Sequence, residues 1–317
     1  MEEELQPTHR KRRRKRRVRL RGIIFLLLLA FIAVGVYVFF QYEAGKEIAA
    51  NEMTAQQPVE FAADAPNGDY ENILVLGVDS RGEEKSRTDT MMLVTHDKIN
   101  GEVKLTSFMR DIYADIPGYQ SYKLNTAYYL GGVDLLADTL RQMFGVEIHH
   151  FALIDFKSFE SLVDVAVPNG VELDVEKEMS KNIGVSLTPG VQKLNGKELL
   201  GYARFRADNE GDFGRVRRQQ QVIAAMKQEM ASVSTVPQLP KLAGALQGYV
   251  QTDMPLTDQV KLATQLAIGG SGDVERLTVP VKDSYRYGNY PQAGSVLDID
   301  IEQNKQALSD FLSQTLD

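Results

Sequence analysis

The stretch Asn72-Ile-Leu-Val-Leu-Gly-Val-Asp79 decides the fold. From Ile73 to Val78 it is a short, nearly continuous apolar run with polar neighbours on both sides. Such a run is typical of a strand that is covered on both faces. The sequence therefore predicts a buried central strand, with the carboxylate of Asp79 directly at its end.

Strand and helix patterns alternate along the rest of the chain. Further strands are predicted at residues 91–95, 103–109, 151–154, 168–175 and 277–281. Helices are predicted at residues 133–144, 156–165, 197–202, 213–230, 242–249, 257–267 and 301–312. This alternation predicts an α/β protein, a three-layer α-β-α sandwich with a mixed central sheet. A loop at Tyr285, Tyr287 and Tyr290 is predicted to be a packed surface turn, with a pocket edge as the alternative.

An apolar segment precedes the predicted sheet. Residues 22–40 carry no charge, and as a helix they would extend roughly 28 Å, close to the ~30 Å hydrocarbon core of a bilayer. The segment is longer than the apolar part of a cleaved secretory signal. It therefore predicts a single transmembrane helix that is not cleaved and that precedes the α/β body.

Basic residues are concentrated before this segment. Ten of the 36 Lys and Arg residues lie between Arg10 and Arg21, and 26 basic residues stand against 40 acidic ones from Gly22 onward. The positive-inside rule then places the N-terminus in the cytoplasm and the body outside the cell membrane, a single-pass type II arrangement. Next to a membrane span, the basic run favours contact with anionic lipids, so we expect no nucleic-acid partner.

Composition divides the chain into five parts. Residues 1–21 are a basic cytoplasmic tail that is predicted to be disordered, and residues 22–40 are the anchor. Residues 41–69 are rich in Ala, Glu, Gln, Asn and Pro and are predicted to form an extracellular stalk with some helix. Residues 70–230 are the main domain, and residues 231–317 are a C-terminal α/β extension that packs on the same body.

Absent motifs narrow the chemistry. The chain has no cysteine, which excludes disulfides and thiolate catalysis. It also lacks the Gly-x-Ser-x-Gly elbow, the His-Glu-x-x-His zinc motif and a Walker-type phosphate loop. His149 and His150 are adjacent and would point to opposite faces of a strand, so a structural role is favoured over a shared metal ion.

Acids and cations cluster near the predicted strand ends. Five arginines lie within residues 204–219, near a helix start, where backbone N–H groups and guanidinium forks favour phosphate. Asp79 and Asp89 flank the first two strands, and paired carboxylates at such ends suit a hard cation such as Mg²⁺. With Arg110 and Lys123 after the third strand, the cations suffice to neutralise a pyrophosphate.

These residues form an ordered series of motifs. The series comprises Gly77-Val78-Asp79-Ser80-Arg81, Arg87-Thr88-Asp89-Thr90, Met109-Arg110-Asp111, Lys123-Leu124-Asn125, Asp155-Phe156 with Phe159, and Arg204-Phe205-Arg206 through Asp212, Arg215, Arg218 and Gln219. It resembles the LytR-CpsA-Psr proteins of Gram-positive cell envelopes. The resemblance covers roughly residues 72–230 and includes the order of anchor, stalk and body.

The resemblance implies an extracytoplasmic phosphotransferase. Such an enzyme moves a glycopolymer, for example wall teichoic acid or capsular polysaccharide, from a polyprenyl-pyrophosphate carrier to peptidoglycan. The implied metal ligands are Asp79 and Asp89, holding Mg²⁺ or, as the alternative, Mn²⁺. The implied pyrophosphate-binding residues are Arg87, Arg110, Lys123, Arg204, Arg206, Arg215, Arg218 and Gln219. The implied catalytic residues are Arg110, Arg204, Arg206, Asp212 and Arg215. Family members hold the isoprenoid tail in an apolar cleft, whose lining residues are not predicted from the motif spacing.

Two other functions stay open at this point. A hydrolase that cleaves the carrier's pyrophosphate with water would use the same charged residues. A membrane-anchored regulator or attenuator without catalysis is a third reading, suggested by the historical names of the family. Within the transferase reading, Asp212 or Asp111 is predicted either to accept the proton of the attacking hydroxyl or to orient the arginines.

Overall fold

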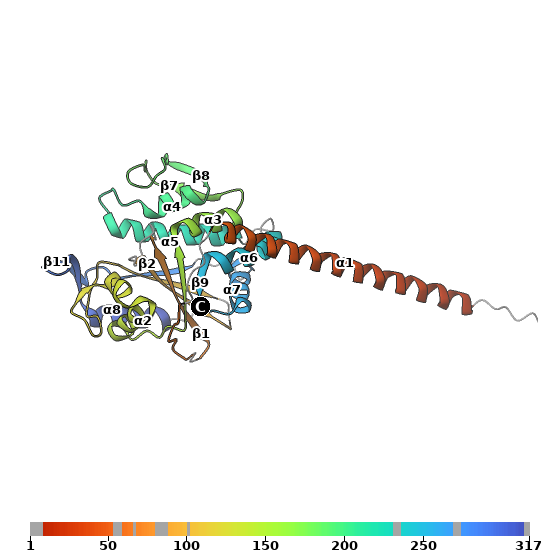
Figure 1. The fold of residues 1–317 in the computed structure, drawn as a ribbon, viewed down its shortest axis with the longest axis horizontal. Coiled ribbons are helices and arrows are strands. Elements are labelled where there is room, and N and C mark those ends of the chain that lie inside the picture. Colours follow the sequence, from red (N-terminus) through yellow and green to blue (C-terminus); the bar gives the residue numbers. More distant parts are fainter. Residues whose placement is uncertain are drawn as a thin grey trace, which may run out of the picture.

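A mixed six-stranded sheet lies at the centre of the protein (Figure 1). The computed structural model describes residues 9–52, 59–65, 68–79, 88–99, 102–230, 236–268 and 274–313. The strand order is β10-β3-β2-β1-β6-β9. These strands are β1 (Tyr70–Val78), β2 (Thr88–Asp97), β3 (Val103–Phe108), β6 (His150–Asp155), β9 (Val250–Thr252) and β10 (Glu275–Val279). β1 pairs antiparallel with β2 and parallel with β6, while β10 is parallel to β3.

Helices cover both faces of the sheet. α2 (Leu124–Phe144) and α8 (Ile301–Ser313) lie on one face, and α3 (Phe156–Ala166), α4 (Gly196–Arg204) and α5 (Gly211–Met230) lie on the other (Figure 1). α6 (Leu239–Tyr249) follows the short 3₁₀ helix Val236–Gln238 and packs on α3, and α7 (Leu256–Ile268) packs on α5 and α6. The predicted three-layer α/β sandwich with a mixed sheet is confirmed.

Three two-stranded hairpins flank the sandwich. They are β4 (Tyr113–Ala114) with β5 (Tyr122–Lys123), β7 (Val171–Val175) with β8 (Gly190–Leu194), and β11 (Tyr285–Tyr290) with β12 (Gly294–Ile299). The prediction of a loop at residues 285–290 is therefore wrong, because that segment is strand β11. Gly288 and Asn289 interrupt its apolar alternation, and both residue types are rare in strands. The fold supplies the pairing with β12 that the local pattern lacks.

The alternation of side chains along β1 divides the two faces. Leu74 and Leu76 are buried in the core shared with α2, whereas Val75 and Gly77 lie on the opposite face. This is the two-residue period of an extended strand. α2 presents buried Leu136 and Leu140 to the first face, so this interface is a packed hydrophobic core.

α2 begins earlier than predicted and ends where predicted. It starts at Leu124 and is interrupted at Gly131 and Gly132, where the backbone leaves the helical region. Its C-cap is Gly145, with φ of 71°, and the N–H of this glycine donates to the carbonyl of Arg141 at 2.8 Å. Glycine adopts this left-handed conformation without a steric penalty.

The C-terminal stretch shares the central sheet and its core. β9 and β10 are the two edge strands of the sheet, although they lie far from its other strands in sequence. Leu308 of α8 is buried in the same core as α2. Residues 236–313, apart from the undescribed gap at 269–273, therefore complete the layers that the earlier residues begin.

The N-terminal helix α1 runs without a break from His9 to Glu52. Its segment Ile23–Asn51 is long and apolar enough to cross a membrane, with a mean hydropathy of 3.0 in its most apolar window. Residues 9–21, predicted to be disordered, continue this helix. Helix propagation costs far less than nucleation, so the apolar helix extends into the basic residues that precede it.

The end of α1 packs closely against α6. A Cβ atom at Gly244 would lie 2.0 Å from the Tyr42 carbonyl oxygen, and one at Gly45 would lie 2.0 Å from the Lys241 carbonyl oxygen. The two helices therefore touch backbone to backbone, as small residues permit. Residues 41–52, predicted to be part of a stalk with some helix, are helical and pack on α6. The Tyr37 hydroxyl also donates to the Pro237 carbonyl at 3.2 Å, so the body sits directly against the apolar segment.

Candidate functional site

A cavity lies between the sheet and the helices α3, α4 and α5. Its volume is about 640 Å³, which is within the range of small-molecule sites. Its apolar lining comprises Val75, Met92 and Ile154 from the sheet and Phe156, Phe159, Leu200, Val222 and Ile223 from the helices. The layer between the sheet and these helices is therefore partly hollow, although Met92 and Leu105 are buried in a packed cluster on the same face.

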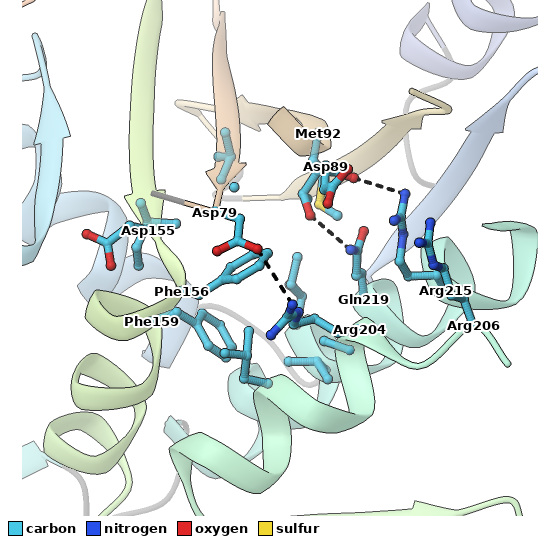
Figure 2. Close-up of a pocket in the computed structure, with 18 of the residues that line it drawn as sticks. Asp79, Asp89, Met92, Asp155, Phe156, Phe159, Arg204, Arg206, Arg215 and Gln219 are labelled. Atoms are coloured by element: carbon cyan, nitrogen blue, oxygen red, sulfur yellow. Dashed lines mark hydrogen bonds and ion pairs between the residues drawn. The ribbon is translucent and has the colours of Figure 1, made fainter. Parts of the chain in front are cut away.

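Asp155 fixes the start of α3 beside the cavity. Its carboxylate accepts hydrogen bonds from the backbone N–H of Ser158 at 2.9 Å and from the Ser158 hydroxyl at 2.7 Å, which is an N-cap. The Asp155 carboxylate is turned away from the arginines, and Phe156 and Phe159 lie on the cavity side (Figure 2). The Asp155-Phe156 motif thus shapes the apolar lining.

Three arginines gather at the charged end of the cavity (Figure 2). Arg204 Nη2 lies 3.7 Å from Asp79 Oδ2, and the Arg204 guanidinium carbon lies 4.4 Å from the centre of the Phe156 ring, a cation–π contact. Arg206 is exposed and forms no ion pair with the residues that the structure describes. Its charge is therefore open to an anion.

Asp89 in β2 is bound by two arginines. Arg110 donates to the Asp89 carboxylate, and Arg215 donates to the Asp89 backbone carbonyl at 3.2 Å. Burial raises the pKa of Asp89, but the charges of Arg110 and Arg215 outweigh it, so the net pKa lies below the ordinary value. Asp89 is therefore a carboxylate at neutral pH.

Asp212 lies on the first turn of α5 and contacts the same arginines. Its carboxylate is 2.8 Å from Arg215 Nη2 and 3.7 Å from Arg110 Nε. Burial raises the pKa of Asp212, and the charges of Arg215 and Arg110 offset only part of this rise. Because Asp212 touches both guanidinium groups, it fixes their orientation.

Gln219 connects α5 to the sheet within the cavity. Its side-chain N–H donates to the Thr90 hydroxyl at 2.9 Å. Thr90 lies opposite Gly77 in the β1–β2 ladder, and a Cβ atom at Gly77 would be only 3.0 Å from the Thr90 Cβ. Glycine at this position therefore leaves room for Thr90 and for its contact with Gln219.

Arg218, one of the predicted pyrophosphate ligands, does not line the cavity. Its side chain is 0% exposed, donates to the Phe205 carbonyl at 2.9 Å and pairs with Asp208. A Cβ atom at Gly214 would lie 3.0 Å from Arg218 Nη1, so glycine makes space for the guanidinium. Arg218 thus fixes the loop that carries Arg206.

Two other predicted residues lie away from this cavity or outside the description. Lys123 in β5 donates to Asp111 at 2.7 Å and borders a second cavity. Arg87 lies outside the described residues, as do Ser80 and Arg81 of the first motif. The structure therefore brings Arg110, Arg204, Arg206, Arg215 and Gln219 together with Asp79, Asp89 and Asp212.

The second cavity adjoins the first at Asp89 and has a volume of about 390 Å³. Its lining is polar and consists of Asp89, Arg110, Asp111, Tyr122, Lys123, Asn125, Thr126, Gln292 and Ala293. Gln292 and Ala293 come from the turn between β11 and β12. The sequence carried no signal for this contribution, because the turn lies far along the chain and its hairpin was not predicted.

Asp79 and Asp89 suit a magnesium ion by their chemistry. Both carboxylates border the same cavity, and Asp89 is held in its charged form. Mg²⁺ commonly takes one or two protein carboxylates and completes its shell with phosphate and water oxygens. Among the described residues, no group of three or more His, Asp and Glu side chains could enclose a metal. The pair therefore fits an ion that is shared with a phosphate-bearing ligand.

The apolar lining of the first cavity was not predicted, although the sequence holds a partial signal for it. Leu74 and Leu76 alternate with Val75 and Gly77 along β1, and the smaller pair borders the cavity. A difference in side-chain size between the two faces is compatible with a hollow on one side. It does not locate the helices that cover the hollow, because those depend on the tertiary packing.

These features define an α/β protein with an N-terminal apolar helix and a hollow sandwich whose apolar cavity ends in arginines and carboxylates. A family model described as LytR_cpsA_psr family matches residues 36–308. The chain belongs to the LytR_cpsA_psr family. The match extends beyond residue 230 and includes the C-terminal strands and most of α8.

Two named relatives of this chain carry different names. The chain is 49% identical over 279 residues to the "Regulatory protein MsrR" of Staphylococcus aureus, covering 88% of this chain and 85% of that protein. It is 30% identical over 247 residues to the "Polyisoprenyl-teichoic acid--peptidoglycan teichoic acid transferase TagU" of Enterococcus faecalis, covering 76% of this chain and 80% of that protein.

Solved structures share the fold. TagV of Bacillus subtilis superposes with a TM-score of 0.66 at 25% identity, covering 79% of this chain and 100% of that chain. A structure of TagT bound to LI-WTA superposes with a TM-score of 0.62 at 25% identity, covering 82% of this chain and 98% of that chain. Each match covers more than three quarters of this chain and nearly all of the other chain.

Proposed function

We propose that this protein is an extracytoplasmic phosphotransferase, which attaches a glycopolymer from a polyprenyl-pyrophosphate carrier to peptidoglycan. One observation carries the proposal: the arginines and the Asp79 and Asp89 carboxylates border the same cavity as a largely apolar lining. A ligand for such a site has a long apolar part and a polyanionic head. A lipid-linked pyrophosphate has both parts, whereas a nucleotide lacks the first.

The membrane anchor supports this choice of donor. α1 packs on α6, and the body meets the apolar segment at Tyr37. A lipid carrier would therefore reach the body without a long excursion from the bilayer. The basic residues before the anchor favour an N-terminus in the cytoplasm and a body outside. TagT bound to LI-WTA is a structural relative with a lipid-linked wall teichoic acid.

The arginines would bind the pyrophosphate and offset its negative charge. Arg206 offers an open guanidinium, Arg204 is positioned by Asp79 and Phe156, and Arg215 is positioned by Asp212. Phosphoryl transfer depends chiefly on positioning and charge neutralisation. These side chains supply both without forming a covalent bond to the substrate.

Asp79 and Asp89 would hold Mg²⁺. A divalent ion there would polarise the phosphate oxygens and neutralise part of their charge. Asp212 is in contact with Arg110 and Arg215 and borders neither cavity. Of the two acids considered for the hydroxyl proton, Asp111 borders the polar cavity. We therefore assign proton acceptance to Asp111 and arginine orientation to Asp212.

The test is a reconstituted reaction with the full-length chain in nanodiscs. A purified polyprenyl-pyrophosphate-linked glycopolymer, peptidoglycan glycan strands and Mg²⁺ are supplied, and the products are identified by mass spectrometry. A polymer joined to peptidoglycan supports the transferase. Free polymer phosphate with no joined product would identify a hydrolase instead, and an unchanged donor would contradict both enzymatic readings.

Two variants test the charged end within this assay. Asp89→Ala should lose Mg²⁺-dependent transfer by on the order of 10²–10³-fold, because it removes a metal ligand and the partner of Arg110. Arg204→Ala should weaken donor binding by about 1.5–3 kcal/mol, the value of a hydrogen bond to a charged group. Arg276→Ala is the matched control, since Arg276 is an exposed arginine on β10. Undiminished transfer by Asp89→Ala would refute the metal assignment.

A second candidate function is a non-catalytic regulator, favoured by the name of the 49%-identical relative from Staphylococcus aureus. In that case the cavity would bind a lipid-linked glycan as a signal. In a strain that lacks the gene, Asp89→Ala expressed at the normal level would then restore normal envelope function. A chain without residues 2–17 but with the anchor retained would fail to restore it. The transferase predicts the reverse of both results.

A further inference from the structure

The polar cavity beside Arg110 has chemistry that the donor lipid does not explain. It shares Asp89 with the apolar cavity, and Arg110 borders it while reaching the Asp89 carboxylate. The two cavities therefore meet at one charged pair. A group bound there is accessible from the lipid side and from the polar side.

We propose that this polar cavity is the acceptor subsite, and that it binds a sugar of the glycan strand whose hydroxyl attacks the donor. The inference rests on the proposed function and extends it to the second substrate. It assigns a role to the C-terminal residues, because the turn between β11 and β12 forms one wall.

Asn125 supplies the first argument. Its residue is 6% exposed and borders the cavity, yet its side-chain amide makes no hydrogen bond to the residues that the structure describes. Neither amide atom is among the described buried atoms that lack a partner, so the amide is open to the cavity and free to bond a ligand there. An amide both donates and accepts, which matches a sugar hydroxyl.

The turn between β11 and β12 supplies the second argument. Gln292 donates from its side chain to the Tyr113 hydroxyl at 2.8 Å, and Tyr113 stacks on Tyr290 with ring centres 4.2 Å apart and planes 7° apart. This stack fixes the turn that carries Gln292 over the cavity. The site is thus held by ordered contacts, with hydrogen-bonding groups from α2 and from the turn between β11 and β12.

The geometry of phosphoryl transfer supplies the third argument. The attacking and leaving oxygens lie roughly in line on opposite sides of the phosphorus. If the lipid phosphate leaves toward the apolar cavity, the hydroxyl enters from the side of Arg110. The polar cavity occupies that side.

The step is balanced with the groups present. The acceptor hydroxyl oxygen forms a bond to the phosphorus that bears the glycopolymer. The bond from that phosphorus to the bridging oxygen breaks, and its electron pair stays on the polyprenyl phosphate. The hydroxyl proton passes to Asp111, which borders the cavity, and then to water.

A sugar in this cavity has two conceivable sources, the acceptor strand and the first sugar of the donor. The experiment separates them with Gln292→Ala and Asn125→Ala in the full-length chain. Gln306→Ala is the control, because Gln306 is an exposed glutamine of α8 whose amide also bonds a side chain. Thermal unfolding of each variant reports whether the fold is intact. Gln292 lies on a turn, so its variant keeps the test valid if Asn125→Ala unfolds.

Acceptor and donor are then titrated independently in the transfer assay. The acceptor subsite predicts that KM for peptidoglycan glycan strands rises by about five- to tenfold in Gln292→Ala, the equivalent of one hydrogen bond. KM for the donor stays at the wild-type value. A matching rise in donor KM, with acceptor KM unchanged, would assign the cavity to the donor sugar and overturn the proposal. No change in either constant would also overturn it.

A binding measurement separates this inference from the proposed function. Uncrosslinked peptidoglycan glycan strands are titrated into the wild-type chain without donor or Mg²⁺. Binding that weakens in Gln292→Ala but not in Gln306→Ala supports the subsite even if no transfer is found. If the wild-type chain shows transfer but Gln292→Ala binds the glycan strands as tightly as the wild type does, the proposed enzymatic function stands and the acceptor subsite is refuted.

Discussion

On one face of the central sheet, Leu74 and Leu76 are buried against α2 in a continuous core. On the other face, Val75 and Gly77 of the same strand border a cavity of about 640 Å³. Adjacent residues of β1 thus lie in two different environments. The filled face gains the full benefit of apolar burial, while the hollow face forgoes part of it. The difference indicates that the α2 side is fully packed, whereas the α3–α5 side leaves a space, which we propose is for a ligand.

The largest expected effect comes from a deletion on the filled face. Leu136→Ala should lower the free energy of unfolding by about 2–5 kcal/mol, because Leu136 of α2 is 0% exposed and leaves a void. Denaturant unfolding of the full chain in detergent measures it. Val191→Ala, at a 68% exposed position, is the control and should change stability by less than about 0.5 kcal/mol. A Leu136→Ala chain of unchanged stability would show that this face is not the main core.

The next prediction compares the same substitution, to phenylalanine, at two adjacent positions of β1. Leu74→Phe overpacks the filled face and should cost about 1–3 kcal/mol of stability. Val75→Phe extends into the cavity and should leave the thermal midpoint near the wild-type value. It should weaken binding of a long-chain polyprenyl pyrophosphate, while inorganic pyrophosphate binds as before. The comparison fails if both variants lose stability equally, since the second face would then be as tightly packed as the first.

The two faces of the sheet also differ in how well their residues could be predicted from the sequence. The apolar run at residues 72–78 predicted β1, and Gly145 predicted the end of α2, because both signals are local. The charged residues at the cavity end were predicted through motifs next to strands. Arg218 has the same charge and lies in the same stretch, yet its guanidinium is buried against Phe205 and Asp208. Which arginines face a ligand depends on helix rotation and loop packing, and spacing does not encode either.

The C-terminal contributions were harder still to predict. Gln292 borders the polar cavity only because β11 and β12 pair and because Tyr290 stacks on Tyr113, 177 positions earlier in the chain. Glycine and asparagine within β11 weaken the local strand pattern. Likewise, the docking of residues 41–52 on α6 depends on small residues in two distant segments. Long-range contacts of this kind leave little trace in composition or periodicity.

The smallest expected effect lies at the edge of the sheet, where β6 pairs with the edge strand β9. His150 Nδ1 lies 2.9 Å from Asp253 Oδ2. The hydrogen bond with Asp253 raises the pKa of His150, together with the charges of Asp253 and Glu71 and against the effect of burial. The folded state therefore binds this proton more tightly than the unfolded state does. The stabilisation is fully present below the ordinary histidine pKa of about 6.5 and is lost as the pH rises through the folded-state pKa.

A partly exposed pair of this kind contributes roughly 0.2–1 kcal/mol, so the measurement is a difference between two chains. The thermal midpoints of the wild type and of His150→Gln should differ most below about pH 6.5 and converge as the pH rises through the raised folded-state pKa of His150. His96 and His149, whose pKa values are lowered first of all by burial, are present in both chains and cancel. A gap that widens with rising pH would mean that His150 is stabilised in its neutral form. The pair would then be a hydrogen bond from the neutral ring to the Asp253 carboxylate, alongside the backbone pairing of β6 with β9.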